Sequence, residues 1–255
     1  MLVVVSPAKR LNEGAAHLPP RTRPEFQDAA DDLARIAGHL TGPELEKLMH
    51  ISPNLGKLNA DRFQNFASGQ GAKSALDLFS GDTYAGLEAA TLDTDALTYA
   101  QDHLRILSGL YGLLRPLDEI MPHRLEMGTR LATERGCGLY EYWGDRIARS
   151  LNRQARNMGS DVVLNCASVE YFKAVDKAAL QPRIVTPVFY EARESGPKIV
   201  SFFAKKARGA MARFVMETRL TDPGGLKDFT SGGYRFQAHE STQSRLVFLR
   251  DTPAA

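Results

Sequence analysis

The chain has 255 residues, a formal net charge of +2, 24% charged residues and 43% hydrophobic residues. A chain of this length buries about 70% of its unfolded surface, and its composition excludes intrinsic disorder and coiled coil as descriptions of the whole. No apolar run approaches the roughly 20 residues that cross a bilayer, and Lys9 and Arg10 follow the first apolar run rather than precede it. We therefore expect a cytoplasmic protein without a membrane contact, in which Cys137 and Cys166 are reduced.

The first half of the chain is predicted to be one strand followed by helices. Residues 2–6 hold four apolar residues before Pro7, which is typical of a short buried strand. A loop rich in proline and glycine follows at residues 9–24. Several of the later helices begin at a serine or threonine, and two of these have a proline in the first turn. Helices are expected at residues 25–40, from Thr41, from Ser52 and at residues 94–108.

The second half alternates between the two kinds of element. Helices are predicted at residues 139–156, 168–175 and 202–218. Strands are predicted at residues 161–167, 183–192, 198–203, 233–238 and 245–249. Because these strands lie far in sequence from residues 2–6, they have to share a sheet across a long connection. We therefore expect an α+β fold, a mixed β-sheet interrupted by a large helical insertion, forming a single compact domain over residues 1–255.

Residues 104–117, LRILSGLYGLLRPL, are the first candidate binding segment. Glycines three residues apart permit a sharp turn with uncovered backbone N–H groups, as in a helix-hairpin-helix element that holds DNA phosphate. The alternative is a turn between two core helices, which the pattern alone favours. The candidate phosphate-binding residues here are Ser108, Gly109, Tyr111, Gly112 and Arg115.

Residues 203–218, FAKKARGAMARFVMET, form the second candidate. Apolar residues at helical spacing leave a basic face with no acidic residue between Ser195 and Met216. Gly209 within that face would let a phosphate backbone approach closely. The alternative is an ordinary solvated face. The candidate cations are Lys205, Lys206, Arg208 and Arg213.

A third group of polar residues lies within otherwise apolar stretches. Two carboxylates in different environments can act as acid and base if they converge in a cleft, whereas caps and structural ion pairs are the alternative explanation. The candidates for one pocket, together with Lys205, are Lys9, Asp82, Tyr84, Glu126, Glu170 and Lys173. The six histidines have no metal-ligand spacing and the chain has no nucleotide fingerprint motif, so neither a metal site nor a cofactor is expected.

Taken in chain order, the segments SPAK, LNADRF, FSGDTY, LSGLYGLLRPLDEI, PHRLEMG, LYEYWG, NCASVEYFK and KIVSFFAKKARGAMARF resemble the YaaA family of peroxide stress proteins. The resemblance extends from about Ser6 to Tyr234. It implies a cytosolic protein that limits free iron, and hence oxidative DNA damage, during hydrogen peroxide stress. It also implies DNA binding through a helix-hairpin-helix motif and a positive cleft, which would match residues 104–117 and 205–213 here.

Two functions follow as hypotheses. In the first, the chain is a stress protein that binds DNA phosphates without reading sequence, through the glycine hairpin and the basic helix, and is expected to be monomeric. In the second, it is an enzyme that acts on a nucleotide, a nucleobase or a nucleic acid in the pocket of Lys, Asp, Glu and Tyr residues. The two are distinguished by whether the pocket candidates line one concave site.

Overall fold

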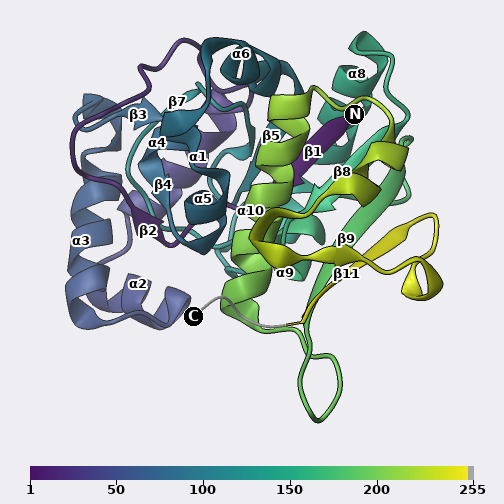
Figure 1. Ribbon diagram of the computed structural model, residues 1–255. Helices are drawn as coiled ribbons and strands as arrows, with labels where there is room; N and C mark the ends of the chain where they lie inside the picture. The colour runs from purple at the N-terminus through teal and green to yellow at the C-terminus, as the bar shows by residue number, and fades with distance from the viewer. Residues whose placement is uncertain (252–255) are drawn as a thin grey trace.

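The computed structural model describes residues 1–251 and is built around one mixed sheet (Figure 1). Five neighbouring strands are parallel, and an antiparallel strand closes each edge. Across the sheet the strands are β10 (Arg235–Phe236), β11 (Arg245–Arg250), β9 (Arg183–Glu191), β8 (Val162–Cys166), β1 (Leu2–Val5), β5 (Leu104–Ser108) and β6 (Gly112–Leu114). Strand β1 lies in the middle and is buried on both faces, which explains its uninterrupted apolar sequence.

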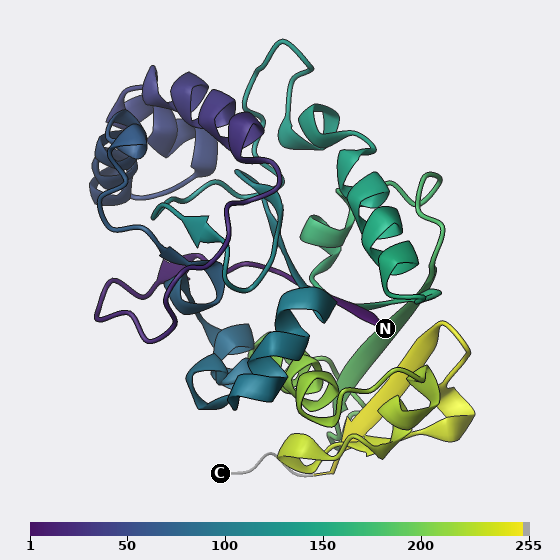
Figure 2. The ribbon, with the colours of Figure 1, turned by 90° about the horizontal axis from the view of Figure 1, so that it is seen from above.

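Helices cover both faces of the sheet, with α10 on one face and α8 on the other (Figure 2). The α-helices are α1 (Gln27–Gly38), α2 (Gly42–Met49), α3 (Pro53–Gln64), α4 (Ala75–Leu78), α5 (Asp82–Leu87), α6 (Thr94–His103), α7 (Leu139–Trp143), α8 (Arg146–Asn157), α9 (Val169–Phe172) and α10 (Ser201–Thr218). The 3-10 turns are η1 (Phe66–Ser68), η2 (Ala89–Thr91), η3 (Pro223–Asp228), η4 (Ser231–Gly233) and η5 (Ala238–Glu240).

The long connection between β1 and β5 is the predicted insertion. It contains α1 to α6 and a short ladder in which β2 (Arg10–Leu11) pairs with β4 (Phe79–Ser80). Its strand β3 (Lys73–Ser74) pairs with β7 (Glu119–Ile120), which follows β6. Two of the predicted caps are confirmed, since Thr41 forms a capping box with Glu44 and the Ser52 side chain accepts from the N–H of Leu55. The cap expected at Thr94 is wrong, because the Asp93 side chain caps α6 instead. A mixed sheet with an inserted helical region is therefore the architecture.

The helix-hairpin-helix expectation is wrong, because residues 104–117 form a β-hairpin. Helix α6 ends at His103, and the chain continues as β5, which pairs with β1 on one side and β6 on the other. A short apolar run fits a buried strand as well as a buried helix, and pairing with the distant β1 decides between them. The helix predicted at residues 94–108 is accordingly helical only over Thr94–His103.

Two further boundaries differ from the prediction. The helix expected at residues 139–156 is broken into α7 and α8 at Gly144, whose φ of +50° ends the first helix. The strand expected at residues 198–203 is reduced to one bridge between Lys198 and Glu191, and α10 already begins at Ser201. The early start of α10 brings its first turn beside the ends of β9 and β11.

Candidate functional site

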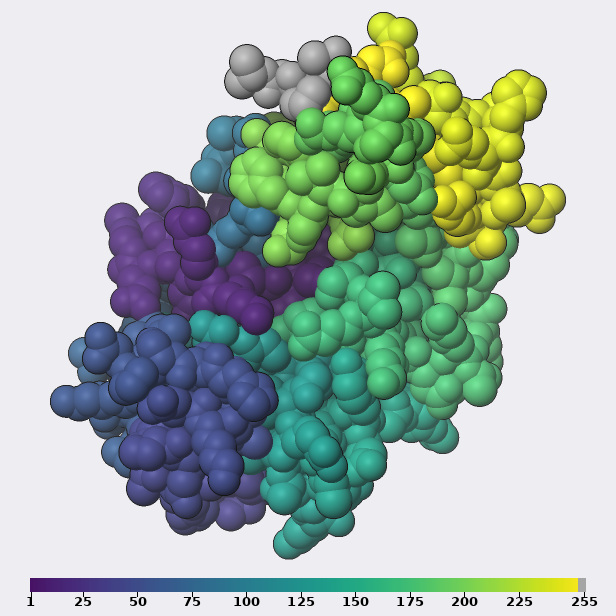
Figure 3. Space-filling view, turned by 90° about the horizontal axis from the view of Figure 1, so that it is seen from below, coloured from purple at the N-terminus to yellow at the C-terminus, as the bar shows by residue number. Residues whose placement is uncertain are grey.

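The carboxyl ends of β1 and β8 mark a change of direction in the sheet. After β1 the chain returns to β5 on one side, whereas after β8 it continues to β9 on the other. Loops diverge at such a point and leave a crevice in which α/β proteins bind ligands. Figure 3 looks onto this edge, where the purple atoms of the loop after β1 lie among the blue atoms of the insertion, the teal segment after β7 and the light green atoms of α10.

Hydrogen bonds join the two diverging loops. The Ser168 backbone N–H donates to Ser6 Oγ over 2.8 Å, and Ser6 Oγ donates to Ser168 Oγ over 3.3 Å. The Tyr84 hydroxyl donates to the Ser6 carbonyl over 3.2 Å. Tyr84 is buried, which raises the pKa of its phenol well above the usual value, so Tyr84 stays protonated and fixes the loop.

Glu126 is the central carboxylate of the site. Its Oε1 lies 3.4 Å from Lys9 Nζ and 2.9 Å from Arg124 Nη2, while its buried Oε2 has no hydrogen-bond partner within residues 1–251. The Glu126 side chain is 12% exposed, whereas that of Lys9 is 66% exposed. Two cations thus hold one oxygen of this carboxylate, and the other keeps its acceptor capacity.

Glu170 borders the same cleft from the loop after β8. Its Oε1 accepts a hydrogen bond from the backbone N–H of Gly128 over 3.1 Å. A cavity of about 870 Å³ is lined by Lys9, Glu126 and Glu170, together with residues of α1 and α2. Lys173 does not line this cavity, and its Nζ lies instead 4.8 Å from the centre of the Tyr140 ring.

Helix α10 adds two cations to this edge. Lys205 Nζ lies 3.9 Å from Asp82 Oδ2, at the start of α5. Arg208 is half buried near Cys166, the last residue of β8, and burial lowers the pKa of its guanidinium. Throughout residues 1–251, Arg208 makes no ion pair or side-chain hydrogen bond. An arginine placed there without a carboxylate partner suits an incoming anion.

The other basic residues of α10 differ in their surroundings. Arg213 donates to the carbonyls of Leu87 and Glu88 and pairs with Glu217 at 2.7 Å. Its guanidinium therefore already has partners for its charge and donors within the protein. Lys206 is exposed and has no ion pair in the described part of the chain. The expectation for Gly209 is wrong, because a Cβ there would lie 1.8 Å from the Thr83 carbonyl oxygen. Gly209 serves close packing of α10 on α5, and its backbone faces protein rather than solvent.

The glycine hairpin lies within the core. Ser108, Gly109, Tyr111 and Gly112 are all buried. The Gly109 carbonyl accepts from Trp143 Nε1 over 2.9 Å. The Tyr111 backbone N–H donates to Ser108 Oγ, and Arg115 pairs with Asp118 at 2.9 Å. Of the donors that were expected to meet phosphate, the Tyr111 N–H and the Arg115 guanidinium are therefore already bonded within the protein.

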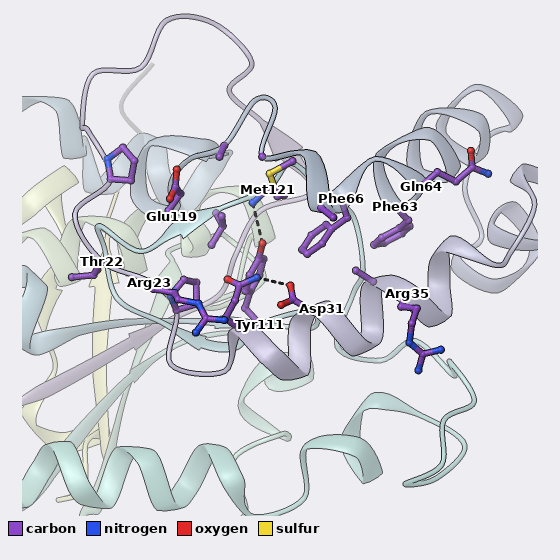
Figure 4. Close-up of a pocket in the computed structure, with 18 of the residues that line it drawn as sticks. Thr22, Arg23, Asp31, Arg35, Phe63, Gln64, Phe66, Tyr111, Glu119 and Met121 are labelled. Carbon is purple, nitrogen blue, oxygen red and sulfur yellow. Dashed lines mark hydrogen bonds between the residues drawn. The ribbon is translucent and has the colours of Figure 1, made fainter.

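A second cavity, of about 880 Å³, lies between residues 20–24, α1 and η1 (Figure 4). Tyr111 and Phe66 border it, and Arg35 points away from its centre. Two of its cations are paired outside the cavity, Arg23 with Asp28 and Arg35 with Asp32. None of the pocket residues expected from the sequence lines it. The first cavity therefore holds the candidate chemistry.

The cysteines and the metal-ligand residues add no cluster to the site. In residues 1–251 no group of three or more His, Cys, Asp or Glu side chains is placed to hold a metal ion. Burial raises the pKa of the Cys166 thiol to about 12, and Cys137 is exposed.

Within residues 1–251, no helix has the length and apolar character needed to cross a membrane.

Known proteins match this chain over nearly its whole length. A family model described as "Peroxide stress protein YaaA" matches residues 1–240. A UPF0246 protein of Ruegeria pomeroyi is 57% identical over 253 residues, covering 98% of both chains. A UPF0246 protein of Cereibacter sphaeroides is 58% identical over 255 residues, covering 98% of this chain and 99% of its own. A UPF0246 protein of Jannaschia sp. is 57% identical over 255 residues, covering 100% of this chain and 98% of its own.

Proposed function

Because the chain belongs to the YaaA family of peroxide stress proteins, we propose that it serves the peroxide response as an enzyme acting on a nucleotide, free or within a nucleic acid. The observation that carries the proposal is the convergence of Lys9, Glu126 and Glu170 on one cavity where β1 and β8 end. Arg208 adds a cation near Cys166, the last residue of β8. Anionic groups of nucleotides bind at such edges in other α/β folds.

The charges divide into two roles. Arg208 and Lys9 would hold a phosphate, because neither is neutralised by a close, fully buried carboxylate: Arg208 has no partner in residues 1–251, and Lys9 lies 3.4 Å from Glu126 but remains 66% exposed. Glu126 would act as a base, with its carboxylate accepting a proton from a hydroxyl, an amine or an attacking water in the cavity that it lines. Arg124 keeps the carboxylate oriented through Oε1. A positioned base of this kind contributes about 10²- to 10⁴-fold to a rate.

The proposal is tested by incubating the protein with nucleobases, nucleoside monophosphates and oligonucleotides and following new products by mass spectrometry. We expect Glu126→Gln to lower product formation at least about 100-fold with binding retained, and Arg208→Ala to weaken binding. Glu240→Gln, an exposed carboxylate in η5, is the matched control and should have no effect. If no probe is bound or converted, the proposal is wrong.

A second candidate is binding of duplex DNA through its phosphates, which would shield DNA from iron-dependent oxidation. Lys205 and Lys206 favour it, because both are exposed on one side of α10. This candidate requires no substrate turnover. It predicts a salt-dependent affinity for duplex DNA that does not depend on Glu126.

A further inference from the structure

Phe202 is an exposed aromatic ring on α10, the helix that also carries Arg208. It lies in the first turn of α10 and is 54% exposed, although most other aromatic side chains of the protein are buried or partly buried. An aromatic ring exposed to this extent offers a flat face on which a partner can stack.

The ring is held in a fixed position. Phe202 packs edge-on against Phe203, with ring centroids 5.4 Å apart. The guanidinium of Arg250 lies 4.4 Å from the Phe203 centroid and is paired with Glu191 at 2.8 Å. Because Glu191 and Arg250 are buried and end two strands of the sheet, Phe203 holds the aromatic pair against the sheet. Such a ring loses little conformational freedom when a flat partner stacks on it.

The surroundings of the ring are basic. Lys205 and Lys206 follow Phe202 by three and four residues, which places both beside it on the helix surface. The first turn of α10 contains no acidic residue. The Asp82 carboxylate approaches Lys205 only to 3.9 Å, from the side of the cleft. A ligand for this surface therefore combines a flat apolar face with negative charge.

We propose that the surface of Phe202, Lys205 and Lys206 binds an unpaired nucleic-acid strand and leads one of its nucleotides into the cleft. A base would stack on Phe202, and backbone phosphates would pair with the two lysines. Unpaired strands suit this surface because their base faces are open, whereas a duplex covers them. This inference rests on the proposed function and adds that the substrate is a nucleotide within a strand.

The test is fluorescence anisotropy with labelled single-stranded DNA, single-stranded RNA and the matched DNA duplex. Phe202→Ala and Phe202→Leu should each weaken single-strand binding about 5- to 150-fold, because both remove the stacking face. Phe202→Trp should bind within about threefold of the wild type. Leu58→Ala, at another exposed apolar position, is the control and should bind normally. Thermal unfolding of each variant separates lost binding from lost folding.

Three results would overturn the inference: a Phe202→Leu variant that binds as tightly as wild type, a preference for the duplex, or no binding of either single strand. The same titrations with Arg208→Ala and a nucleoside monophosphate separate the two proposals. If Arg208→Ala weakens single-strand binding and Phe202→Ala does not, the stacking surface is contradicted but the proposed function is not. If the wild type binds neither the monophosphate nor the single strands, the proposed function is contradicted as well.

Discussion

The β5–β6 hairpin and helix α10 both carry glycines that suggested a close approach of phosphate, yet they differ in what surrounds them. In the hairpin, the backbone groups are taken by Trp143 and Ser108, and Arg115 is paired. In α10, Gly209 is likewise covered by protein, but Lys205 and Lys206 remain exposed and Arg208 has no partner in the described chain.

The comparison shows that glycine and charge give different information in this fold. Glycines mark places where two backbones pack closely, as Gly209 and Gly86 do between α10 and α5. Cations without protein partners mark places where a ligand is needed to balance charge. The carboxyl edge of the sheet therefore differs from the hairpin in the cations that it leaves exposed, although both were expected to bind phosphate.

The largest effect is expected from Gly209→Ala. The added Cβ would lie 1.8 Å from the Thr83 carbonyl oxygen, which belongs to the backbone and cannot turn aside. We expect a loss of about 3 kcal/mol in the free energy of unfolding, measured by denaturant titration. Gly38→Ala is the control, because its Cβ meets nothing closer than 3.4 Å. A stable Gly209→Ala protein would mean that the backbone of α10 is open to ligand after all.

The hairpin region should give a pH-dependent stability through His123. Burial lowers the pKa of His123 to about 4, below its usual 6.5. Between these two values the unfolded chain binds a proton that the folded chain does not, so stability falls as the pH drops from 6.5 to 4. The total loss is about 3 kcal/mol.

Urea unfolding across this pH range checks the His123 prediction. His123→Gln should reduce the slope between pH 6.5 and 5 by about 1.4 kcal/mol per pH unit. His239→Gln changes an exposed histidine and should leave the slope as it is. An equal slope in wild type and His123→Gln would contradict a buried neutral imidazole.

The basic face of α10 should appear in salt dependence rather than in stability. Lys205→Ala with Lys206→Ala should reduce the log–log salt slope of duplex DNA binding by about 2 units. Because both side chains are exposed, the free energy of unfolding should change by less than about 0.5 kcal/mol. Arg156→Ala with Arg183→Ala, at the amino edge of the sheet, is the matched control. An unchanged slope in the α10 double variant would remove these lysines from the binding surface.

The smallest effect is expected at Cys166. With a pKa of about 12, only about one thiol in 10⁵ is ionised at pH 7, so reaction with peroxide or iodoacetamide is slow. The exposed Cys137 should be labelled first, as followed by mass spectrometry of the native protein. Rapid oxidation of Cys166 in the folded state would instead make the edge of the sheet a peroxide sensor.

Much of the fold was predictable because its strands are apolar and its helices are capped locally. Strand β1 and the starts of α2 and α3 follow from residues within a few positions. The hairpin was not, because residues 104–108 suit a helix or a strand and only pairing with β1 decides. Three of the residues expected in one pocket, Lys9, Glu126 and Glu170, line the same cavity, whereas Asp82, Tyr84, Lys173 and Lys205 do not. Sequence could not separate them, because the cavity depends on contacts between distant segments, such as Ser6 with Ser168.

The central claim is that the carboxyl edge of the sheet, and not the hairpin, holds the phosphate-bearing ligand. The most direct measurement is amide NMR of the isotope-labelled protein during titration with a nucleoside monophosphate. The account predicts shifts at residues 6–9, 124–128, 166–170 and 205–208, around Arg208 and Glu126. Shifts at residues 108–116, or around the cavity of Figure 4, with none at the carboxyl edge would contradict it.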